Sequence, residues 1–416
     1  MREKGNILII TKSMLPYTGA FGSCQRIYYL ANYLADKGFR VTVMAEKTGK
    51  VNVDLDAMER QFESRWLEGK PCFGNGILNT GFAKKISKAI FNEIHENTAF
   101  RYYIWRVTNT GEILAYIEHR KIHTVIISGP CFSIFGLCGK IKRRYKNVNV
   151  VLDYRDPWNL WNDGHGIASI LEHWNIKKSD KVVCFSEDFK KGMQKRFPAE
   201  RGKYEVVYNG FCEKAWDEIA IKQTGHKRMV FKYIGGISFP VEKNDYRNPK
   251  GLIEAFLNIC NDRDVELQFI GVGQLTREMK MVEKKSKYKI VFHPVVTVTE
   301  SLRQMTDGDV LITIHDAGNQ SDQYILSAKL FDYLRSGKVI LNIGKAESAL
   351  SRFIKENGVG YSCENQRTVI EKMLVRLYDL WQNNGRFIER GNRNFDCSTY
   401  SREYQNERYV RLLNKL

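Results

Sequence analysis

Lys329 and Asp332 are the pair of residues whose types and spacing point most directly to chemistry. Ser327 is a suitable N-cap and Gly337 a suitable residue after a helix end, so a helix is expected between them. Residues three apart share one face of a helix. An ammonium and a carboxylate near the start of such a helix can bind the phosphate and the ribose hydroxyls of a nucleotide. The alternative is an ordinary surface ion pair.

A second candidate site is the loop 153–158, Asp-Tyr-Arg-Asp-Pro-Trp, which follows a predicted strand. Polar clusters at the carboxyl end of a parallel strand are more often functional than structural, because the core of the sheet does not need them. Arg155 and Asp156 are therefore candidate functional residues. The structural alternative pairs Arg155 with a neighbouring carboxylate and uses Trp158 to fill the rim. The polar residues here lack a recognised ligand spacing, so no metal site is predicted.

The chain opens with a strand, a glycine loop and a helix, an arrangement that binds phosphate at a helix N-terminus. Gly19 and Gly22 give the spacing GxxG rather than the GxGxxG of dinucleotide-binding turns. Gly271 and Gly273 form a GxG, but the third glycine is missing. Nicotinamide or flavin binding is a weak alternative, and no cofactor is predicted.

The candidate residues can form a site only if strands of the fold end beside them. Short apolar runs alternate with amphipathic stretches in both halves of the chain, which indicates parallel strands joined by helices. The predicted fold class is therefore α/β, with two doubly wound, Rossmann-like domains. Strands are expected at 6–11, 40–45, 124–128, 148–152, 181–185, 229–234, 265–270, 289–292, 309–314 and 338–342. The predicted domains are 1–210 and 211–397, followed by a helix at 398–416 that can return to either half.

Composition narrows the possible functions. Hydrophobic residues make up 43% of the 416 residues, which excludes a mainly disordered chain. Lys and Arg number 65 against 47 Asp and Glu, and the net charge of +18 indicates an anionic partner: nucleic acid, a membrane or a phosphorylated substrate. The nine cysteines are scattered without a CxxC, which predicts a reducing, cytoplasmic location. No apolar run suits a signal peptide or a spanning helix.

Part of the positive charge lies in the amphipathic segment 81–107, where cations alternate with large apolar side chains. A basic amphipathic helix of this kind can lie in the interface of an anionic membrane. The alternative is a helix that packs on the sheet and presents a basic face to solvent, because most surface helices are amphipathic. The segment is therefore a candidate contact with an anionic membrane.

Several motifs occur in a specific order: the opening strand, glycine loop and helix; Ser128-Gly-Pro130; Asp153-Tyr-Arg-Asp-Pro-Trp158; Val207-Tyr-Asn-Gly-Phe211; Tyr233-Ile-Gly-Gly236; and Ser327-Ala-Lys-Leu-Phe-Asp-Tyr-Leu-Arg-Ser-Gly-Lys338. In this order they resemble the retaining glycosyltransferases of family four. That family has the GT-B fold, in which two Rossmann-like domains face each other across a central cleft. The loop D-x-R-D-P-W is similar to a branch found among enzymes of bacterial surface polysaccharides.

The resemblance implies a donor site in the second domain and an acceptor site in the first. The implied donor-binding residues are Gly235, Gly236, Arg247, Lys250, Lys329 and Asp332. The implied catalytic residues are Arg155, Asp156 and Lys329, and the implied acceptor-binding residues are Gly19, Gly22 and Trp158. Alternatively, Arg247 and Lys250 only begin a solvated helix.

Two departures from the family pattern are evident. Tyr324 replaces the first acid of the usual Glu-x7-Glu motif, and Asp332 replaces the second. Arg155-Asp156 stands where the family commonly has a His-Asp pair, so a histidine role does not carry over.

The expected function is therefore transfer of a sugar from a nucleotide-diphosphate sugar to a glycan or lipid-linked acceptor. The resemblance implies retention of anomeric configuration without a metal, in cell-surface polysaccharide biosynthesis. The nucleotide-sugar is a substrate, so no cofactor is expected. The expected location is the cytoplasm, at the inner face of the plasma membrane if 81–107 binds lipid. Alternatives are a nucleotide-sugar epimerase or hydrolase and, more distantly, a basic nucleic-acid-binding protein; the latter lacks a known reading module.

Overall fold

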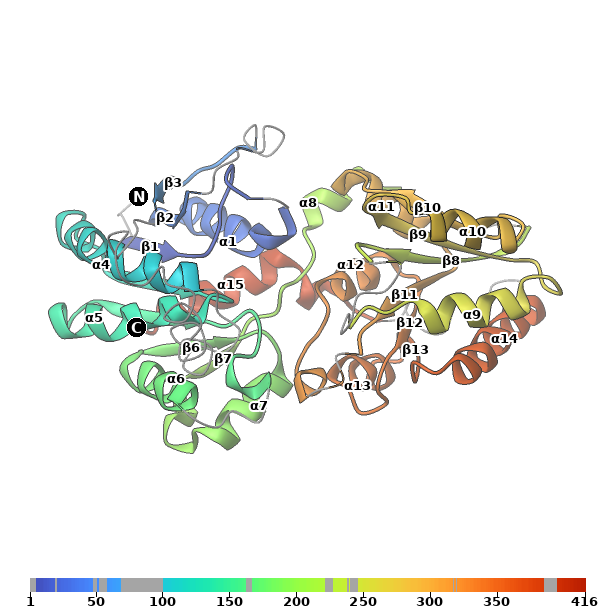
Figure 1. Ribbon diagram of the computed structural model, residues 1–416. Helices are drawn as coiled ribbons and strands as arrows, with labels where there is room; N and C mark the ends of the chain where they lie inside the picture. The colour runs from blue at the N-terminus through green and yellow to red at the C-terminus, as the bar shows by residue number, and fades with distance from the viewer. Residues whose placement is uncertain are drawn as a thin grey trace, which may run out of the picture. The chain divides into compact units, whose positions relative to one another are not determined.

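The computed structural model describes residues 5–18, 21–47, 51, 58–68, 100–161, 167–220, 227–237, 239, 246–316, 318, 320–384 and 395–416. The chain divides into two units. Unit 1 comprises Met1–Tyr208 and Gln405–Leu416, and unit 2 comprises Asn209–Tyr404. Each unit contains a sheet covered by helices (Figure 1).

The described strands of unit 1 are β1 (Asn6–Ile10), β2 (Arg40–Glu46), β3 (Glu63–Leu67), β4 (Thr124–Ser128), β5 (Asn149–Asp153), β6 (Lys181–Cys184) and β7 (Tyr204–Val206). They pair in the order β3-β2-β1-β4-β5-β6-β7, and every pairing is parallel. The central strands β1 and β4 are continuous apolar runs because helices cover both faces of the sheet.

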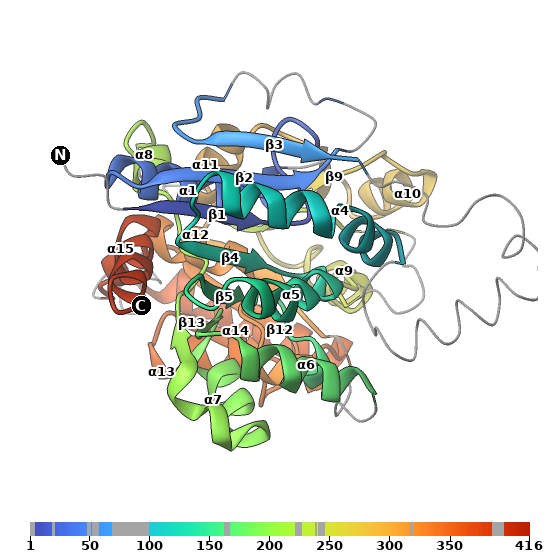
Figure 2. The same ribbon diagram turned by 90° about the vertical axis from the view of Figure 1, so that its left-hand side faces the viewer.

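The described α-helices of unit 1 are α1 (Gln25–Asp36), α4 (Phe100–His119), α5 (Leu137–Arg144), α6 (Ile167–Lys178), α7 (Glu187–Arg196) and most of α15 (Arg402–Leu413). Short 3-10 helices lie at η1 (Phe21–Ser23), η2 (Phe132–Gly136), η3 (Asn159–Trp161) and η4 (Pro198–Lys203). Figure 2 shows α4, α5 and α6 side by side over the sheet. The core around α1 and β1 includes Tyr409, Val410 and Leu412 of α15, so the C-terminal helix completes unit 1.

The described strands of unit 2 are β8 (Met229–Ile234), β9 (Val265–Val272), β10 (Ile290–Pro294), β11 (Val310–Ile314), β12 (Val339–Ile343) and β13 (Gly360–Cys363). Their order is β10-β9-β8-β11-β12-β13, again with parallel pairings throughout. The helices are α8 (Glu213–Trp216), α9 (Lys250–Ile259), α10 (Arg277–Lys285), α11 (Val298–Thr306), α12 (Ala328–Ser336), α13 (Ala349–Glu356) and α14 (Arg367–Asn384), with η5 (Gln320–Gln323) and η6 (Ser398–Tyr400). The predicted class of two doubly wound parallel α/β domains is confirmed.

The strand orders place the candidate residues. In unit 1 the chain leaves β1 toward β2 and later returns to β4 on its other side, and β8 lies in the same way between β9 and β11. Ligands of open parallel sheets bind beside the carboxyl ends of strands at such a switch point. The sequence did not predict β3, β7 and β13, because these edge strands mix polar and apolar residues and lack the buried run of a central strand.

Candidate functional site

In unit 2 the carboxyl end of β8 forms a tight glycine turn under a lysine. Gly235 has a φ of +134°, and its N–H donates to the carbonyl of Ile270 at 2.7 Å. A Cβ placed on Gly235 would lie 2.5 Å from Nζ of Lys329 and 2.7 Å from its Cε. Only glycine therefore fits the backbone conformation and leaves room for the lysine. The turn and Lys329 therefore lie together at the carboxyl end of β8.

Lys329 lies in the first turn of α12, which ends at Gly337 in the left-handed conformation. Its Nζ is 3.9 Å from the ring centroid of Tyr233, the second-last residue of β8, and makes a cation–π contact with it. Burial, together with the positive charge of Arg247, lowers the pKa of Lys329 to about 7. A lysine with so low a pKa sits in a positive, poorly solvated site, which an anionic ligand would stabilise.

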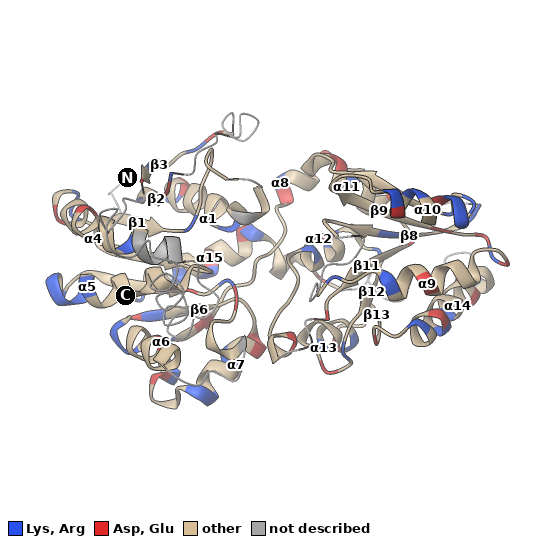
Figure 3. Ribbon diagram, viewed as in Figure 1, with Lys and Arg blue, Asp and Glu red and all other residues tan. Residues whose placement is uncertain are grey.

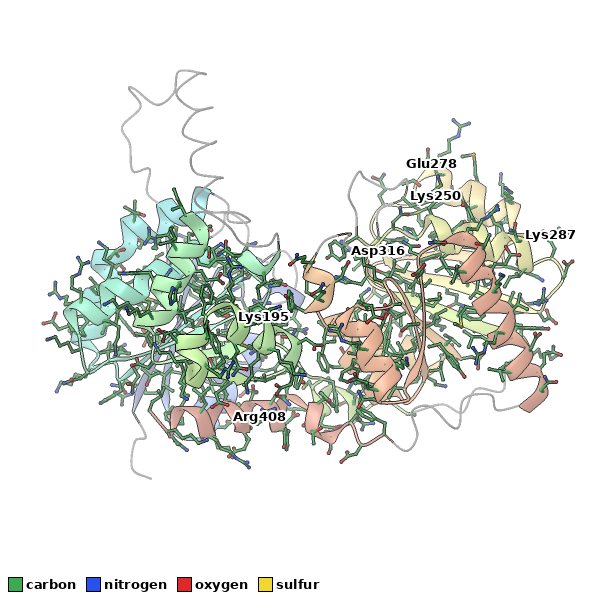
Figure 4. All side chains as sticks on the ribbon, turned by 90° about the horizontal axis from the view of Figure 1, so that it is seen from below. Lys195, Lys250, Glu278, Lys287, Asp316 and Arg408 are labelled. Atoms are coloured by element: carbon green, nitrogen blue, oxygen red, sulfur yellow. The ribbon has the colours of Figure 1, made fainter. Side chains whose placement is uncertain are left out.

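Arg247 is the second cation at this turn. A Cβ on Gly236 would lie 4.0 Å from its Nη1, and its guanidinium lies 5.0 Å from the ring centroid of Tyr246. The N–H of Asp316 donates to the carbonyl of Tyr246 at 2.9 Å, which anchors this loop at the end of β11. The structure thus brings Arg247 to Lys329 and the glycine turn. Lys250, in contrast, is exposed at the start of α9 (Figure 4), and no contact among the described residues joins it to this cluster.

Lys329 and Asp332 lie on one helix but contact different partners. Oδ1 of Asp332 accepts a hydrogen bond from Nε1 of Trp216 at 3.3 Å. Burial raises the pKa of Asp332 to about 6, although Arg402 and Trp216 counteract the change. An ion pair would raise the pKa of the lysine and lower that of the aspartate, whereas both change in the opposite direction. Among the described residues, no ion pair joins Lys329 and Asp332: the lysine contacts the ring of Tyr233, and the aspartate accepts from Trp216.

The sequence reasoning missed a polar cluster after β11. Nε2 of His315 lies 3.4 Å from Oδ1 of Asp322, and Nζ of Lys345 lies 3.4 Å from its Oδ2. The rings of His315 and Tyr246 meet edge to face at 5.2 Å, so this cluster supports the Arg247 loop. Burial lowers the pKa of His315. The signal was available, because His315 directly follows the apolar run of β11, a strand next to β8.

In unit 1 Asp153 anchors the end of β5. Its carboxylate is fully buried and lies 2.9 Å from Nη2 of Arg26, and Oγ of Ser128 donates to it at 2.8 Å. Nη1 of Arg26 donates to the carbonyls of Val207 and Tyr208 at 3.0 and 3.1 Å. Arg26 thus joins helix α1, the end of β5 and the two residues that follow β7. The sequence reasoning did not single out this arginine.

Arg155 and Asp156 follow Asp153 at the same rim. Burial lowers the pKa of Arg155, and the charges of Asp156 and Asp153 counteract the change. Burial raises the pKa of Asp156, against the positive charges of Arg155 and Lys12. The loop therefore holds opposite charges at the carboxyl ends of β1 and β5, an arrangement compatible with both the functional and the structural interpretation.

The predicted acceptor residues differ in accessibility. Trp158 is 1% exposed and stacks on Phe132 with ring centroids 5.2 Å apart. This burial does not support a contact between Trp158 and an acceptor, because the indole fills the core below the loop. Gly22 is exposed, and a Cβ there would meet no atom within 4 Å. Gly19 and most of the segment 81–107 lie outside the described residues.

A buried carboxyl group holds both ends of the loop after β5. Glu172 of α6 accepts hydrogen bonds from the hydroxyl of Tyr154 at 3.0 Å and from Nδ2 of Asn159 at 2.8 Å. Burial raises its pKa to about 7, although Asn159, Tyr154 and the charge of Arg196 oppose the change. Glu172 is therefore a positioning residue for the loop that carries Arg155.

The raised pKa of Glu172 predicts a pH-dependent stability. Between pH 4.5 and 7 the native state holds a proton that the unfolded state has lost, so the free energy of unfolding decreases as pH rises through this interval. We expect Glu172→Gln to remove roughly 1–3 kcal/mol of this decrease. Urea unfolding from pH 5 to 8 measures it, with exposed Glu187→Gln as the control. Equal pH profiles for wild type and Glu172→Gln would contradict the assignment.

Known proteins share the fold of this chain and part of its sequence. The family model for Glycosyltransferase Family 4 matches residues 22–212, a stretch that includes most of unit 1. No curated protein matches the sequence. Among the described residues, no helix is both long and apolar enough to cross a membrane.

Three solved structures each align with 99% of the chain. A glycosyltransferase from Rickettsia africae ESF-5 has a TM-score of 0.67 at 13% identity over 98% of its length. The catalytic domain of Starch Synthase IV from Arabidopsis thaliana, bound to ADP and acarbose, has a TM-score of 0.65 at 11% identity over 99%. A protein described as a UDP-N-acetylglucosamine 2-epimerase from Listeria monocytogenes has a TM-score of 0.58 at 10% identity over 96%. The chain has the GT-B fold, and together with the family 4 domain this supports a glycosyltransferase.

Proposed function

We propose that the protein transfers a sugar from a nucleotide-diphosphate sugar to a glycan or lipid-linked acceptor. The observation that best supports this function is that Lys329 and Arg247 both lie at the Gly235–Gly236 turn at the end of β8. Two cations beside a turn without side chains fit a diphosphate, because its oxygens can approach the backbone. Asp332 lies three residues after Lys329 on α12, less than one helical turn further along, and its carboxylate is suited to a ribose hydroxyl.

The proposed reaction breaks the bond between the anomeric carbon and the diphosphate oxygen and forms a bond to an acceptor hydroxyl. Negative charge grows on the departing diphosphate, and Lys329, Arg247 and the N-terminus of α12 stabilise it. The resemblance to family four supports retention of configuration without a metal. NMR of the product anomer and turnover in chelator test these two points.

We assign acceptor binding to unit 1, at the rim that carries Arg155, Asp156 and exposed Gly22. A lipid-linked acceptor in cell-surface polysaccharide synthesis would place the enzyme at the cytoplasmic face of a membrane, with 81–107 as one contact. The fold shared with the epimerase-like protein keeps a nucleotide-sugar epimerase or hydrolase as the second candidate. Fast turnover without any acceptor would favour that candidate.

The first test is nucleotide binding. A thermal-shift panel of UDP-, GDP-, CDP- and ADP-sugars should show one base that raises the melting temperature, because a ligand of the native state stabilises it. For that nucleoside diphosphate we expect the Kd to increase above pH 7, since Lys329 loses its proton there, by up to about tenfold per pH unit. Calorimetry should also show proton uptake on binding. A pH-independent Kd from pH 6 to 9 would contradict the role of Lys329.

A further inference from the structure

Helix α6 presents large apolar side chains to solvent. Ile167, Ile170 and Trp174 are 49%, 69% and 40% exposed. Their spacing of three and four residues places them in one stripe along the helix. The opposite face of α6 carries the buried Ala168, Glu172, Asn175 and Ile176. The stripe therefore lies on the face of α6 opposite to the one that packs on the rest of unit 1.

Cations surround this stripe. A Cβ on Gly139 of α5 would collide with the indole of Trp174, so the ring lies against α5. Lys140 and Arg143 are exposed next to that contact, one residue and one turn after Gly139. Lys177 and Lys178 are exposed one turn after Trp174. Figure 3 shows such basic residues along α5 and at the end of α6.

Among the described residues of α5 and α6, acids offset little of this charge. Helix α5 contains no Asp or Glu, and the single acid of α6, Glu172, is fully buried. Asp180, just after α6, lies 3.0 Å from Nζ of Lys142 and neutralises that lysine rather than the exposed ones. The stripe and its four exposed cations therefore form an apolar surface in a positive field.

We propose that this α5–α6 surface docks the protein on the surface of an anionic phospholipid bilayer. The isoleucines and Trp174 enter the interface, where an indole suits the boundary between apolar and wet layers, and the lysines and Arg143 face acidic headgroups. Charge complementarity favours this occupant over an apolar protein partner, which would leave the four cations unpaired. The biological role of this docking rests on the proposed function, because a lipid-linked acceptor would lie in the membrane that the surface binds.

The experiment is co-sedimentation of the full chain with vesicles of phosphatidylcholine alone or with 30% phosphatidylserine, at two salt concentrations. We expect binding to the acidic vesicles that weakens as salt rises. Ile167→Ser with Ile170→Ser, and separately Lys177→Gln with Lys178→Gln, should each weaken it about tenfold or more. Equal binding to both vesicle types, or none, would overturn the proposal.

Matched variants in unit 2 serve as controls. Val295→Ser with Val298→Ser removes two exposed valines, and Lys284→Gln with Lys285→Gln removes two exposed lysines of the basic helix α10. These variants should bind vesicles like the wild type, and equal loss in both sets would overturn the location on α6. A dimer in size-exclusion chromatography that Ile167→Ser with Ile170→Ser dissolves would identify a second copy as the occupant and overturn the proposal.

Nucleotide binding in solution separates this proposal from the proposed function. The α6 variants should keep the thermal shift produced by the preferred nucleotide-sugar, because they leave the Lys329 site unchanged. Vesicle binding without any response to nucleotide-sugars would contradict the proposed function while supporting the docking surface.

Discussion

Lys329→Met is expected to weaken nucleoside-diphosphate binding strongly and, at the same time, to make the protein more stable. Below about pH 7 the native state buries a charged ammonium near Arg247, and this burial has a cost in free energy. Between pH 7 and 10.5 the unfolded state holds a proton that the native state has lost, so the stability of the wild type rises with pH. Methionine removes the cost and the pH dependence.

We expect Lys329→Met to raise the free energy of unfolding at pH 7 by roughly 1–3 kcal/mol, after loss of the cation–π contact with Tyr233. The Kd for the preferred nucleoside diphosphate should increase about 100-fold, because a charged partner at the diphosphate is lost. Urea unfolding and calorimetry measure the two effects. Lys285→Met, at an exposed site of α10, should change neither. A destabilised variant that still binds nucleotide would show that Lys329 is structural.

Arg26→Ala should be the most destabilising single change in unit 1. It leaves the carboxylate of Asp153 fully buried without its guanidinium partner and leaves the carbonyls of Val207 and Tyr208 without this donor. Breaking a buried ion pair from one side costs about 3–5 kcal/mol. Arg26→Lys should cost less than Arg26→Ala because it keeps the positive charge beside Asp153. It should still destabilise the protein, because lysine lacks the guanidinium fork that reaches Asp153 and the two carbonyls together.

The matched control is Arg144→Ala. Arg144 lies 3.1 Å from Glu118, but both side chains of this pair are more than half exposed. Its loss should cost much less than the loss of Arg26, because solvent screens an exposed pair. Chemical denaturation of the three variants gives the comparison. If Arg26→Ala costs no more than Arg144→Ala, Asp153 is not held by the buried pair described here.

Much of the fold follows from local patterns. The apolar runs at β1, β4, β8 and β11 predicted buried parallel strands, and Gly337 predicted the end of α12. From these elements alone, the loop after β5 and the turn after β8 were expected at the carboxyl rims of two sheets. The edge strands β3, β7 and β13 escaped prediction because only one neighbour pairs with each, and their sequences are correspondingly mixed, whereas the edge strand β10 was predicted.

Local patterns in the sequence show which residues can do chemistry and at which strand ends they lie. The directions of their side chains depend on tertiary packing: Lys329 lies over Gly235 and Tyr233, whereas Asp332 points to Trp216. The reason is that helical spacing places two residues on one face, but the packing around the helix determines what each side chain meets. Likewise, the pairing of Arg26 with Asp153 joins residues 127 positions apart, and no local pattern records it.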